Sequence, residues 1–278
     1  MSGPAVPIRM IALDLDGTVL NSEKTITPRT RRALGLAIGQ GVTVLPATGR
    51  LRNGLPEEFL QIPGVRYAVT ANGAAVLDLQ TGERIYSGCL TAEEALWQYR
   101  ATRGWDVMFD VYAGDTIATE RAVFPRLEEF APAAMVPYFR KTRTCVDDME
   151  AFLLNLHTPI EKVTMLFTRS EERALAMDLL PDGGRFLVTS SIPRNLEVNA
   201  QGVDKGVGLL ALARHLGIDP RAVMACGDSS NDEAMLRAVG FSVAMGNASE
   251  GIRALADAVT DTNDCDGVAK AVERWVLR

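Results

Sequence analysis

The sequence has few of the residues from which proteins build disulfide frameworks and zinc sites. Its 278 residues include four cysteines, no two of them in a CxxC pair, and only two histidines. A structural zinc site would therefore lack its clustered ligands. Disulfides persist mainly in oxidising compartments. We therefore expect reduced thiols and a cytoplasmic protein.

Long apolar runs and an excess of basic charge are also missing. No uninterrupted apolar run reaches the length of about 18 residues that a membrane-spanning helix needs, and the N-terminal segment does not resemble a secretory signal. Lys and Arg number 29 against 35 Asp and Glu, which gives a formal net charge of -6. A mildly acidic chain carries no electrostatic signature for nucleic acid or anionic membranes. We therefore expect neither as a partner.

Short apolar runs alternate with helical patterns near both ends of the chain. Residues 10–13 and 42–45 form such runs in the first part, and residues 222–226 and 241–245 form them in the last part. Uninterrupted runs of this length are typical of strands buried on both faces. Strand, helix, strand is the unit of a parallel sheet. The two ends therefore predict one doubly wound, Rossmann-like α/β domain.

The middle of the chain has a different pattern. Short strand candidates, such as residues 105–112 and 162–167, alternate there with helical stretches. A segment of about 100 residues is long enough for a domain of its own. We interpret residues 83–190 as an inserted α+β domain that divides the core domain into residues 1–82 and 191–278.

Two acidic residues follow the first apolar run. Asp14 and Asp16 would lie at the carboxyl end of the first strand, where doubly wound sheets bind ligands. One carboxylate could attack phosphorus while the other moves the proton of the leaving group, and Gly17 would permit a sharp turn. Asp and Gly are also common turn residues. With the apolar run before it, this motif fits a plain turn and a catalytic site about equally well.

A second acidic motif follows the apolar run at residues 222–226. Asp228 could complete an oxygen cage for Mg²⁺, which prefers carboxylate ligands and water. Alternatively, Ser229, Asn231 and Asp232 simply cap the next helix. Both interpretations can hold together, since capping atoms and ligand atoms can lie side by side.

Two further segments fit a phosphate site. Thr48 and Gly49 follow the run at residues 42–45, where a hydroxyl and backbone N–H groups can hold phosphate. Lys205 could supply fixed positive charge beside the carboxylates. Taken alone, Thr48-Gly49 fits an ordinary turn or cap and Lys205 a solvated surface residue. Together with the acidic motifs, these residues meet the demands of one phosphoryl-transfer reaction.

The ordered motifs resemble the haloacid dehalogenase superfamily, and within it the Cof-type phosphatases with a large inserted cap. The resemblance rests on Asp14-Leu15-Asp16-Gly17-Thr18, Thr48-Gly49-Arg50, Ala71-Asn72-Gly73-Ala74, Lys205, Gly227-Asp228 and Asn231-Asp232. One departure is Pro46, which sits late in a strand that should be central and removes a ladder donor. It predicts that this strand ends or bulges before Thr48.

The resemblance implies a role for each matching residue. Asp14 would be the nucleophile and a Mg²⁺ ligand, Asp16 the general acid/base and a ligand through its backbone carbonyl, and Asp228 the third protein ligand. Asp232 would orient the metal-bound water or Lys205. The residues that would hold phosphate are Leu15 (through its backbone N–H), Thr48, Gly49, Lys205 and Asn231.

We therefore expect a Mg²⁺-dependent phosphatase that hydrolyses a small phosphate ester, by default a sugar phosphate, through a phospho-aspartyl intermediate on Asp14. A phosphosugar mutase, a phospho-accepting signalling domain and a ligand-binding protein without catalysis are the alternatives. Asp16 argues against the signalling domain, which needs no general acid two residues after its nucleophile. The sequence names no physiological substrate, and it leaves open whether the protein is a monomer or a dimer.

Overall fold

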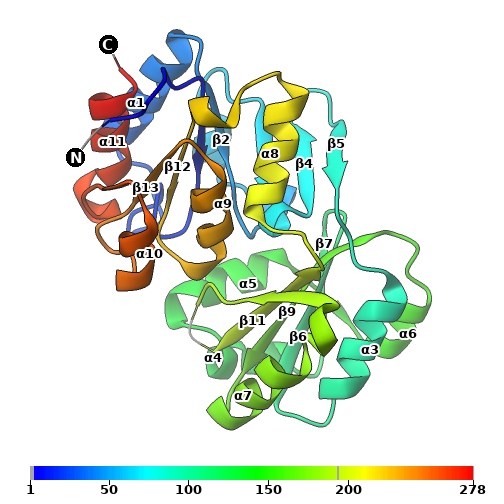
Figure 1. Ribbon diagram of the computed structural model, residues 1–278. Coiled ribbons are helices and arrows are strands. Elements are labelled where there is room, and N and C mark those ends of the chain that lie inside the picture. The colour runs from blue at the N-terminus through cyan, green and yellow to red at the C-terminus, as the bar shows by residue number, and fades with distance from the viewer. Residues whose placement is uncertain (1–2, 193, 278) are drawn as a thin grey trace. The chain divides into compact units, whose positions relative to one another are not determined.

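The computed structural model of the protein describes residues 3–192 and 194–277. These residues form two compact units. The first unit contains the described residues up to Ser87 and those from Asp204 onward, and the second unit extends from Gly88 to Val203. The second unit is therefore inserted into the sequence of the first, as the colours of Figure 1 show.

A five-stranded parallel sheet forms the centre of the first unit, with the strand order β14-β13-β12-β1-β2 (Figure 1). Its strands are β1 (Met10–Leu13), β2 (Thr43–Pro46), β12 (Val223–Gly227), β13 (Phe241–Ala244) and β14 (Ala258–Val259). Every residue of β1, β12 and β13 is buried. This burial explains the uninterrupted apolar runs, because both faces of the sheet are covered.

Helices pack on both faces of this sheet (Figure 1). The helices α1 (Pro28–Gly39) and α11 (Gly267–Trp275) share one apolar cluster with alternate residues of β1. On the other face lie α8 (Lys205–His215), α9 (Glu233–Ala238) and α10 (Glu250–Leu255). Successive strand residues point to opposite faces, so each face has its own apolar core. The predicted doubly wound α/β fold is confirmed.

A three-stranded antiparallel sheet adjoins β2 in the first unit. It consists of β3 (Tyr67–Thr70), β4 (Ala75–Asp78) and β5 (Arg84–Ser87), and the short helix α2 (Glu57–Leu60) precedes it. A parallel bridge between Ala47 and Val69 joins it to the end of β2. The strand β2 ends at Pro46, as the proline predicts.

The second unit contains a six-stranded sheet with the order β10-β11-β9-β6-β7-β8. Its strands are β6 (Val107–Ala113), β7 (Thr116–Glu120), β8 (Arg143–Val146), β9 (Ile160–Phe167), β10 (Phe186–Thr189) and β11 (Asn195–Ala200). One face packs on α3 (Ala92–Thr102), α6 (Met149–Leu154) and α7 (Ser170–Leu179), and part of the other packs on α4 (Leu127–Phe130) and α5 (Val136–Thr142). All pairs except β7 with β8 are antiparallel, which gives this unit its α+β character.

The unit boundaries differ from the interpretation of residues 83–190 as the insertion. The strand β5 lies after residue 82 but pairs with β4 in the first unit. The strand β11 lies after residue 190 but pairs with β9 in the second unit. Strand pairing decides both boundaries: β5 follows β4 closely in the chain, whereas β11 pairs with a strand about 30 residues earlier. Local composition carries little information about such pairing.

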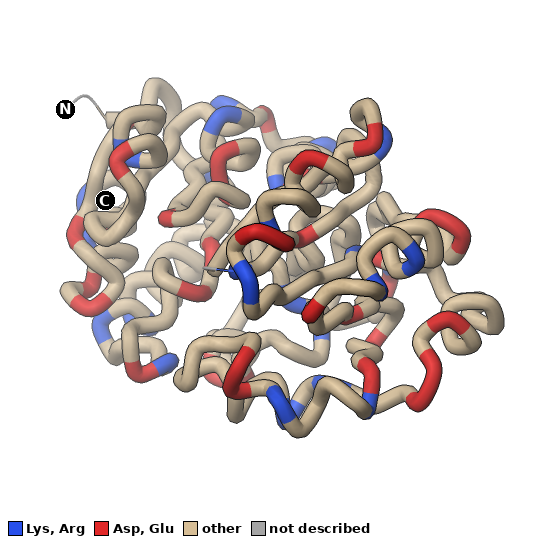
Figure 2. Tube along the Cα trace, turned by 90° about the horizontal axis from the view of Figure 1, so that it is seen from below, with Lys and Arg blue, Asp and Glu red and all other residues tan. Residues whose placement is uncertain are grey.

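Acidic and basic residues are interspersed along the described chain (Figure 2). In the described ranges, the helices lack the combination of length and apolar character that a membrane crossing requires.

Candidate active site

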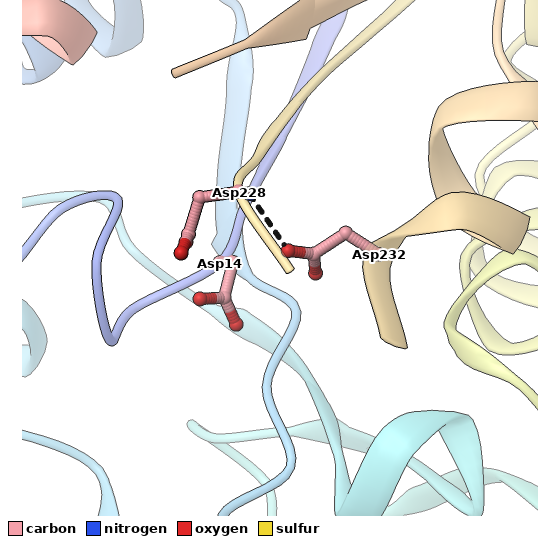
Figure 3. Close-up of side chains that lie close together, drawn as sticks. All are labelled: Asp14, Asp228 and Asp232. Carbon is pink, nitrogen blue, oxygen red and sulfur yellow. Dashed lines mark hydrogen bonds between the residues drawn. The ribbon is translucent and has the colours of Figure 1, made fainter. Parts of the chain in front are cut away.

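Two adjacent strands place carboxylates at the same edge of the parallel sheet. Leu13 lies beside Cys226 in the register of β1 and β12. Asp14 follows β1, and its backbone N–H donates to the carbonyl of Cys226 at 3.0 Å. Asp228 follows β12. The carboxyl ends of parallel neighbours coincide, so these two side chains lie together (Figure 3).

Lys205 lies at the start of α8 and is fully buried. Its Nζ donates at 2.6 Å to Oδ1 of Asp14 and at 2.6 Å to Oδ1 of Asp232. Burial favours a lower pKa for Lys205, but the two carboxylates outweigh it and raise the pKa above its usual value. Lys205 is therefore a permanent cation that links the end of β1 to the segment after β12.

Both carboxylate oxygens of Asp232 accept hydrogen bonds. Oδ1 accepts from Lys205, and Oδ2 accepts from the backbone N–H groups of Asp228 and Ser229 at 2.9 and 3.0 Å. Gly227 permits this approach, because a Cβ there would lie 2.6 Å from the Asp232 side chain. Asp232 thus holds both Lys205 and the turn that carries Asp228. Figure 3 shows its hydrogen bond to Asp228.

The carboxylate of Asp228 is held by two hydroxyls. Thr18 donates to its Oδ1 at 2.8 Å and Ser229 to its Oδ2 at 3.1 Å. Gly17 has φ of +87°, and a Cβ on it would lie 2.5 Å from Oδ2 of Asp228. Only glycine suits this turn, both for its backbone conformation and for its proximity to Asp228.

The acidic cluster carries more negative charge than its single lysine balances. Burial raises the pKa of Asp14 well above its ordinary value, and the charges of Asp232 and Asp228 add to this effect against the attraction of Lys205. Burial and the charge of Asp232 raise the pKa of Asp228 to about 6. Carboxylate oxygens of Asp14, Asp228 and Asp232 lie within 4.8 Å of one another. Such a group of hard oxygen donors with surplus negative charge fits Mg²⁺.

Asp16 is held apart from this cluster by two cations. Arg50 donates from Nε and Nη2 to the two oxygens of Asp16, each at 2.8 Å, and Lys24 donates to Oδ1 at 2.9 Å. Burial alone would raise the pKa of Asp16, but the hydrogen bonds and charges of Arg50 and Lys24 outweigh it and lower the pKa to about 2. In this conformation Asp16 is an ionised carboxylate.

The expected phosphate-binding residues form a second polar group around the end of β2. The backbone N–H of Arg50 donates to Oγ1 of Thr48 at 3.2 Å, and that of Asn72 donates to the carbonyl of Thr48 at 3.0 Å. The side-chain amide of Asn231 donates to Oδ1 of Asn72 at 3.2 Å. The buried Oδ1 of Asn231 has no partner among the described residues.

The described contacts of Thr48 and Asn231 do not include Asp14, and the Leu15 side chain is fully buried in the core. Sequence reasoning gave no role to Thr18, Lys24 or Asn72. Thr18 and Asn72 lie inside quoted motifs and could have been found there, whereas no sequence signal distinguishes Lys24.

Comparison with known proteins identifies the family. The sequence model of the haloacid dehalogenase-like hydrolases matches residues 11–272. The chain belongs to this family. The predicted resemblance is thus confirmed, and with it the phosphatase class, since similar proteins of this family carry phosphatase names.

Three of these similar proteins span almost the whole chain. The chain is 31% identical to the 5-amino-6-(5-phospho-D-ribitylamino)uracil phosphatase YcsE of Bacillus subtilis, over 98% of this chain and 97% of that protein. A solved haloacid dehalogenase-like hydrolase from B. subtilis has a TM-score of 0.86 at 28% identity, and the match covers 96% and 99% of the two chains. The sugar phosphatase BT4131 has a TM-score of 0.80 at 26% identity, with 95% and 98% covered.

Proposed function

We propose that this haloacid dehalogenase-like hydrolase is a Mg²⁺-dependent phosphatase that transfers the phosphoryl group of a small metabolite to Asp14. The observation that carries this proposal is the placement of Asp14 at the sheet edge, bonded to the buried Lys205 and beside Asp228. A carboxylate fixed by a cation is a positioned nucleophile. Lys205 also supplies positive charge for phosphoryl oxygens.

The chemistry divides between Asp14 and Asp16. In the first step, a bond forms between a carboxylate oxygen of Asp14 and phosphorus, while the bond from phosphorus to the leaving-group oxygen breaks. Asp16, which is ionised in this conformation, would first take up a proton from solvent and then donate it to that oxygen. In the second step, Asp16 accepts a proton from water, which attacks phosphorus and breaks the bond to Asp14. Inorganic phosphate leaves, Asp14 is again a carboxylate, and Asp16 again carries the proton that it had taken up.

The cofactor would be held by the carboxylates of Asp14 and Asp228 and by the backbone carbonyl of Asp16. When bound, Mg²⁺ would neutralise negative charge on the carboxylates and the phosphoryl group. Asp232 would keep Lys205 and the Asp228 turn in place, since its two oxygens already accept three hydrogen bonds. Thr48, Gly49, Asn231 and the backbone N–H of Leu15 would bind the phosphoryl oxygens.

The names of similar proteins suggest the substrate class. They include a 5-amino-6-(5-phospho-D-ribitylamino)uracil phosphatase, an HMP-PP phosphatase at 27% identity, and a sugar phosphatase. We propose a phosphorylated small metabolite, with the ribitylamino-uracil phosphate and sugar phosphates tested first. We also propose that the second unit acts as the cap that selects the leaving group. A cytoplasmic location is proposed as well, and the presence of all four cysteines as free thiols supports it.

The test is Mg²⁺-dependent phosphate release over a panel of phosphorylated metabolites, with the Asp14→Asn variant beside the wild type. The amide keeps the shape of the side chain but cannot attack phosphorus. We expect a loss of at least about 100-fold, or about 2.7 kcal/mol of transition-state stabilisation. A phosphorylated aspartate should be detectable by mass spectrometry of acid-quenched wild type and absent from the variant.

The control is Asp219→Asn, which changes an exposed carboxylate in the same unit and should retain activity. More than about a tenth of wild-type activity in Asp14→Asn, a loss below about 1.4 kcal/mol, would refute the covalent mechanism. Full activity of metal-free protein in excess chelator would refute the magnesium site. Isomerised product without free phosphate would indicate a mutase instead.

A further inference from the structure

A basic pocket lies in the second unit, at the N-terminus of α7. The helix is labelled in Figure 1. Its volume is about 450 Å³, and its lining residues are Thr168, Arg169, Ser170, Arg173 and Arg194. Three arginines thus surround one pocket in a protein whose formal net charge is -6. Pockets of this volume fall in the range of small-molecule sites, roughly 300–1,000 Å³.

Within residues 3–192 and 194–277, the arginines of this pocket have no carboxylate partner as close as those of six other arginines of the unit. Arg173 donates to the carbonyl of Asn195 at 3.2 Å and to the hydroxyl of Ser190 at 3.3 Å, and Arg194 donates to the carbonyl of Glu129 at 3.4 Å. Arg169 lies 3.6 Å from Glu172. Six other arginines of the unit lie 2.5–3.0 Å from a carboxylate: Arg100, Arg103, Arg121, Arg126, Arg140 and Arg143.

The nearby acidic side chains are occupied by other partners. Glu172 accepts from the backbone N–H of Asp106 at 3.1 Å. Asp106 accepts two hydrogen bonds from Arg126, at 2.9 and 3.0 Å, and one from Thr168 at 2.6 Å. Among the described residues, neither carboxylate forms an ion pair with Arg173 or Arg194, although Glu172 lies near Arg169.

The start of α7 adds to the positive potential. The residue before the helix is Arg169, and no side chain there caps the helix. Arginine has no acceptor to offer the first backbone N–H groups, and a cation at a helix N-terminus is opposed by the helix dipole. A bound anion would balance the positive charge of the guanidinium groups. It would also interact favourably with the dipole at the N-terminus of α7.

We propose that this pocket binds the phosphate group of a small metabolite or inorganic phosphate itself. The guanidinium groups of Arg169, Arg173 and Arg194 form charge-assisted hydrogen bonds to its oxygens, and the α7 N-terminus adds a favourable dipole. The site is built from residues of the second unit alone and does not depend on the proposed reaction.

The experiment follows the Nε–Hε resonances of arginine in the ¹⁵N-labelled, metal-free full-length protein during titration with inorganic phosphate at constant ionic strength. We expect the Arg173 resonance to shift along one saturating curve. Arg169→Gln/Arg194→Gln removes two exposed guanidinium groups and should weaken this binding at least tenfold. Arg121→Gln/Arg140→Gln removes the same charge from exposed, carboxylate-paired positions of the same unit and should leave the curve unchanged.

A second titration uses ribose 5-phosphate on the Asp14→Asn variant, which prevents turnover. Tighter binding than that of inorganic phosphate assigns the pocket to a phosphorylated metabolite, and equal or weaker binding assigns it to free phosphate. An Arg173 resonance that stays unmoved by both probes would overturn the inference. So would an unchanged affinity in Arg169→Gln/Arg194→Gln.

Discussion

Replacing Lys205 by methionine should both destabilise the first unit and stop catalysis. The side chain is fully buried, and its Nζ lies 2.6 Å from each of two carboxylates. Methionine would leave Asp14 and Asp232, both buried, without their cation. Removing one partner of a buried ion pair costs about 3–5 kcal/mol. In a domain of about 150–250 residues, this corresponds to a Tm lower by about 6–20 °C.

Thermal and urea unfolding at neutral pH, followed by circular dichroism, measure this effect. The matched control is Lys270→Met, which breaks an exposed ion pair with Asp261 in the same unit and should cost at most about 1 kcal/mol. Asp232→Asn supplies the second test. The double variant Lys205→Met/Asp232→Asn should lose less stability than the two single variants added together, since it removes opposite charges as a pair.

Two results would refute this reasoning. Equal Tm values for Lys205→Met and Lys270→Met would show that the buried lysine contributes no more to stability than a surface lysine does. Strict additivity in the double variant would show that Lys205 and Asp232 are not energetically coupled, despite the 2.6 Å bond.

Three further substitutions test separate parts of the structure. Gly17→Ala should raise the Mg²⁺ concentration needed for half-maximal activity, because the added Cβ would displace Asp228; an unchanged metal titration contradicts this. Asp16→Asn should slow hydrolysis of alkyl phosphates more than of activated aryl phosphates, whose leaving groups need no proton; equal losses would reject the general-acid role. Arg143→Met leaves the fully buried Asp110 without its 2.9 Å partner and should destabilise the second unit by about 3–5 kcal/mol. Hydrogen exchange of β6 and β9 measures this, and unchanged protection there would refute it.

The positions of Asp14 and Asp228 at one edge of the core sheet were predictable from the sequence, because they depend on local sequence patterns. A short apolar run specifies a strand buried on both faces, and a helix between two such runs specifies parallel strands. Any polar residue directly after such a strand then lies at the ligand-binding edge. Asp14 and Asp228 follow this rule, and the pairing of Leu13 with Cys226 brings them together.

The surroundings of Asp16 were not predictable in the same way. Two acids separated by one residue in a turn can point together or apart, and the residue types alone do not determine which. The partners of Asp16 come from 8 and 34 residues away in the chain. Such distant contacts depend on loop conformation, which composition does not determine. The strands β5 and β11 at the limits of the insertion were also missed, because composition does not tell which sheet a strand joins.

The distribution of charge in the first unit is itself an argument for the proposed reaction. Asp14, Asp228 and Asp232 share one cation, Lys205, so full ionisation leaves two uncompensated negative charges. Burial is the main cause of the raised pKa values of Asp14 and Asp228, and the neighbouring carboxylates add to it. A divalent cation would remove it.

The surroundings of Asp16, two residues after Asp14, are basic instead of acidic. Asp16 forms ion pairs with both Arg50 and Lys24. A phosphate dianion that bound here would compete with Asp16 for these cations. If Arg50 and Lys24 turned toward phosphate, the hydrogen bonds and charges that hold the pKa of Asp16 at about 2 would weaken, and burial would then raise that pKa. Phosphate binding would thereby convert Asp16 from an ion-paired carboxylate into a group able to carry the leaving-group proton.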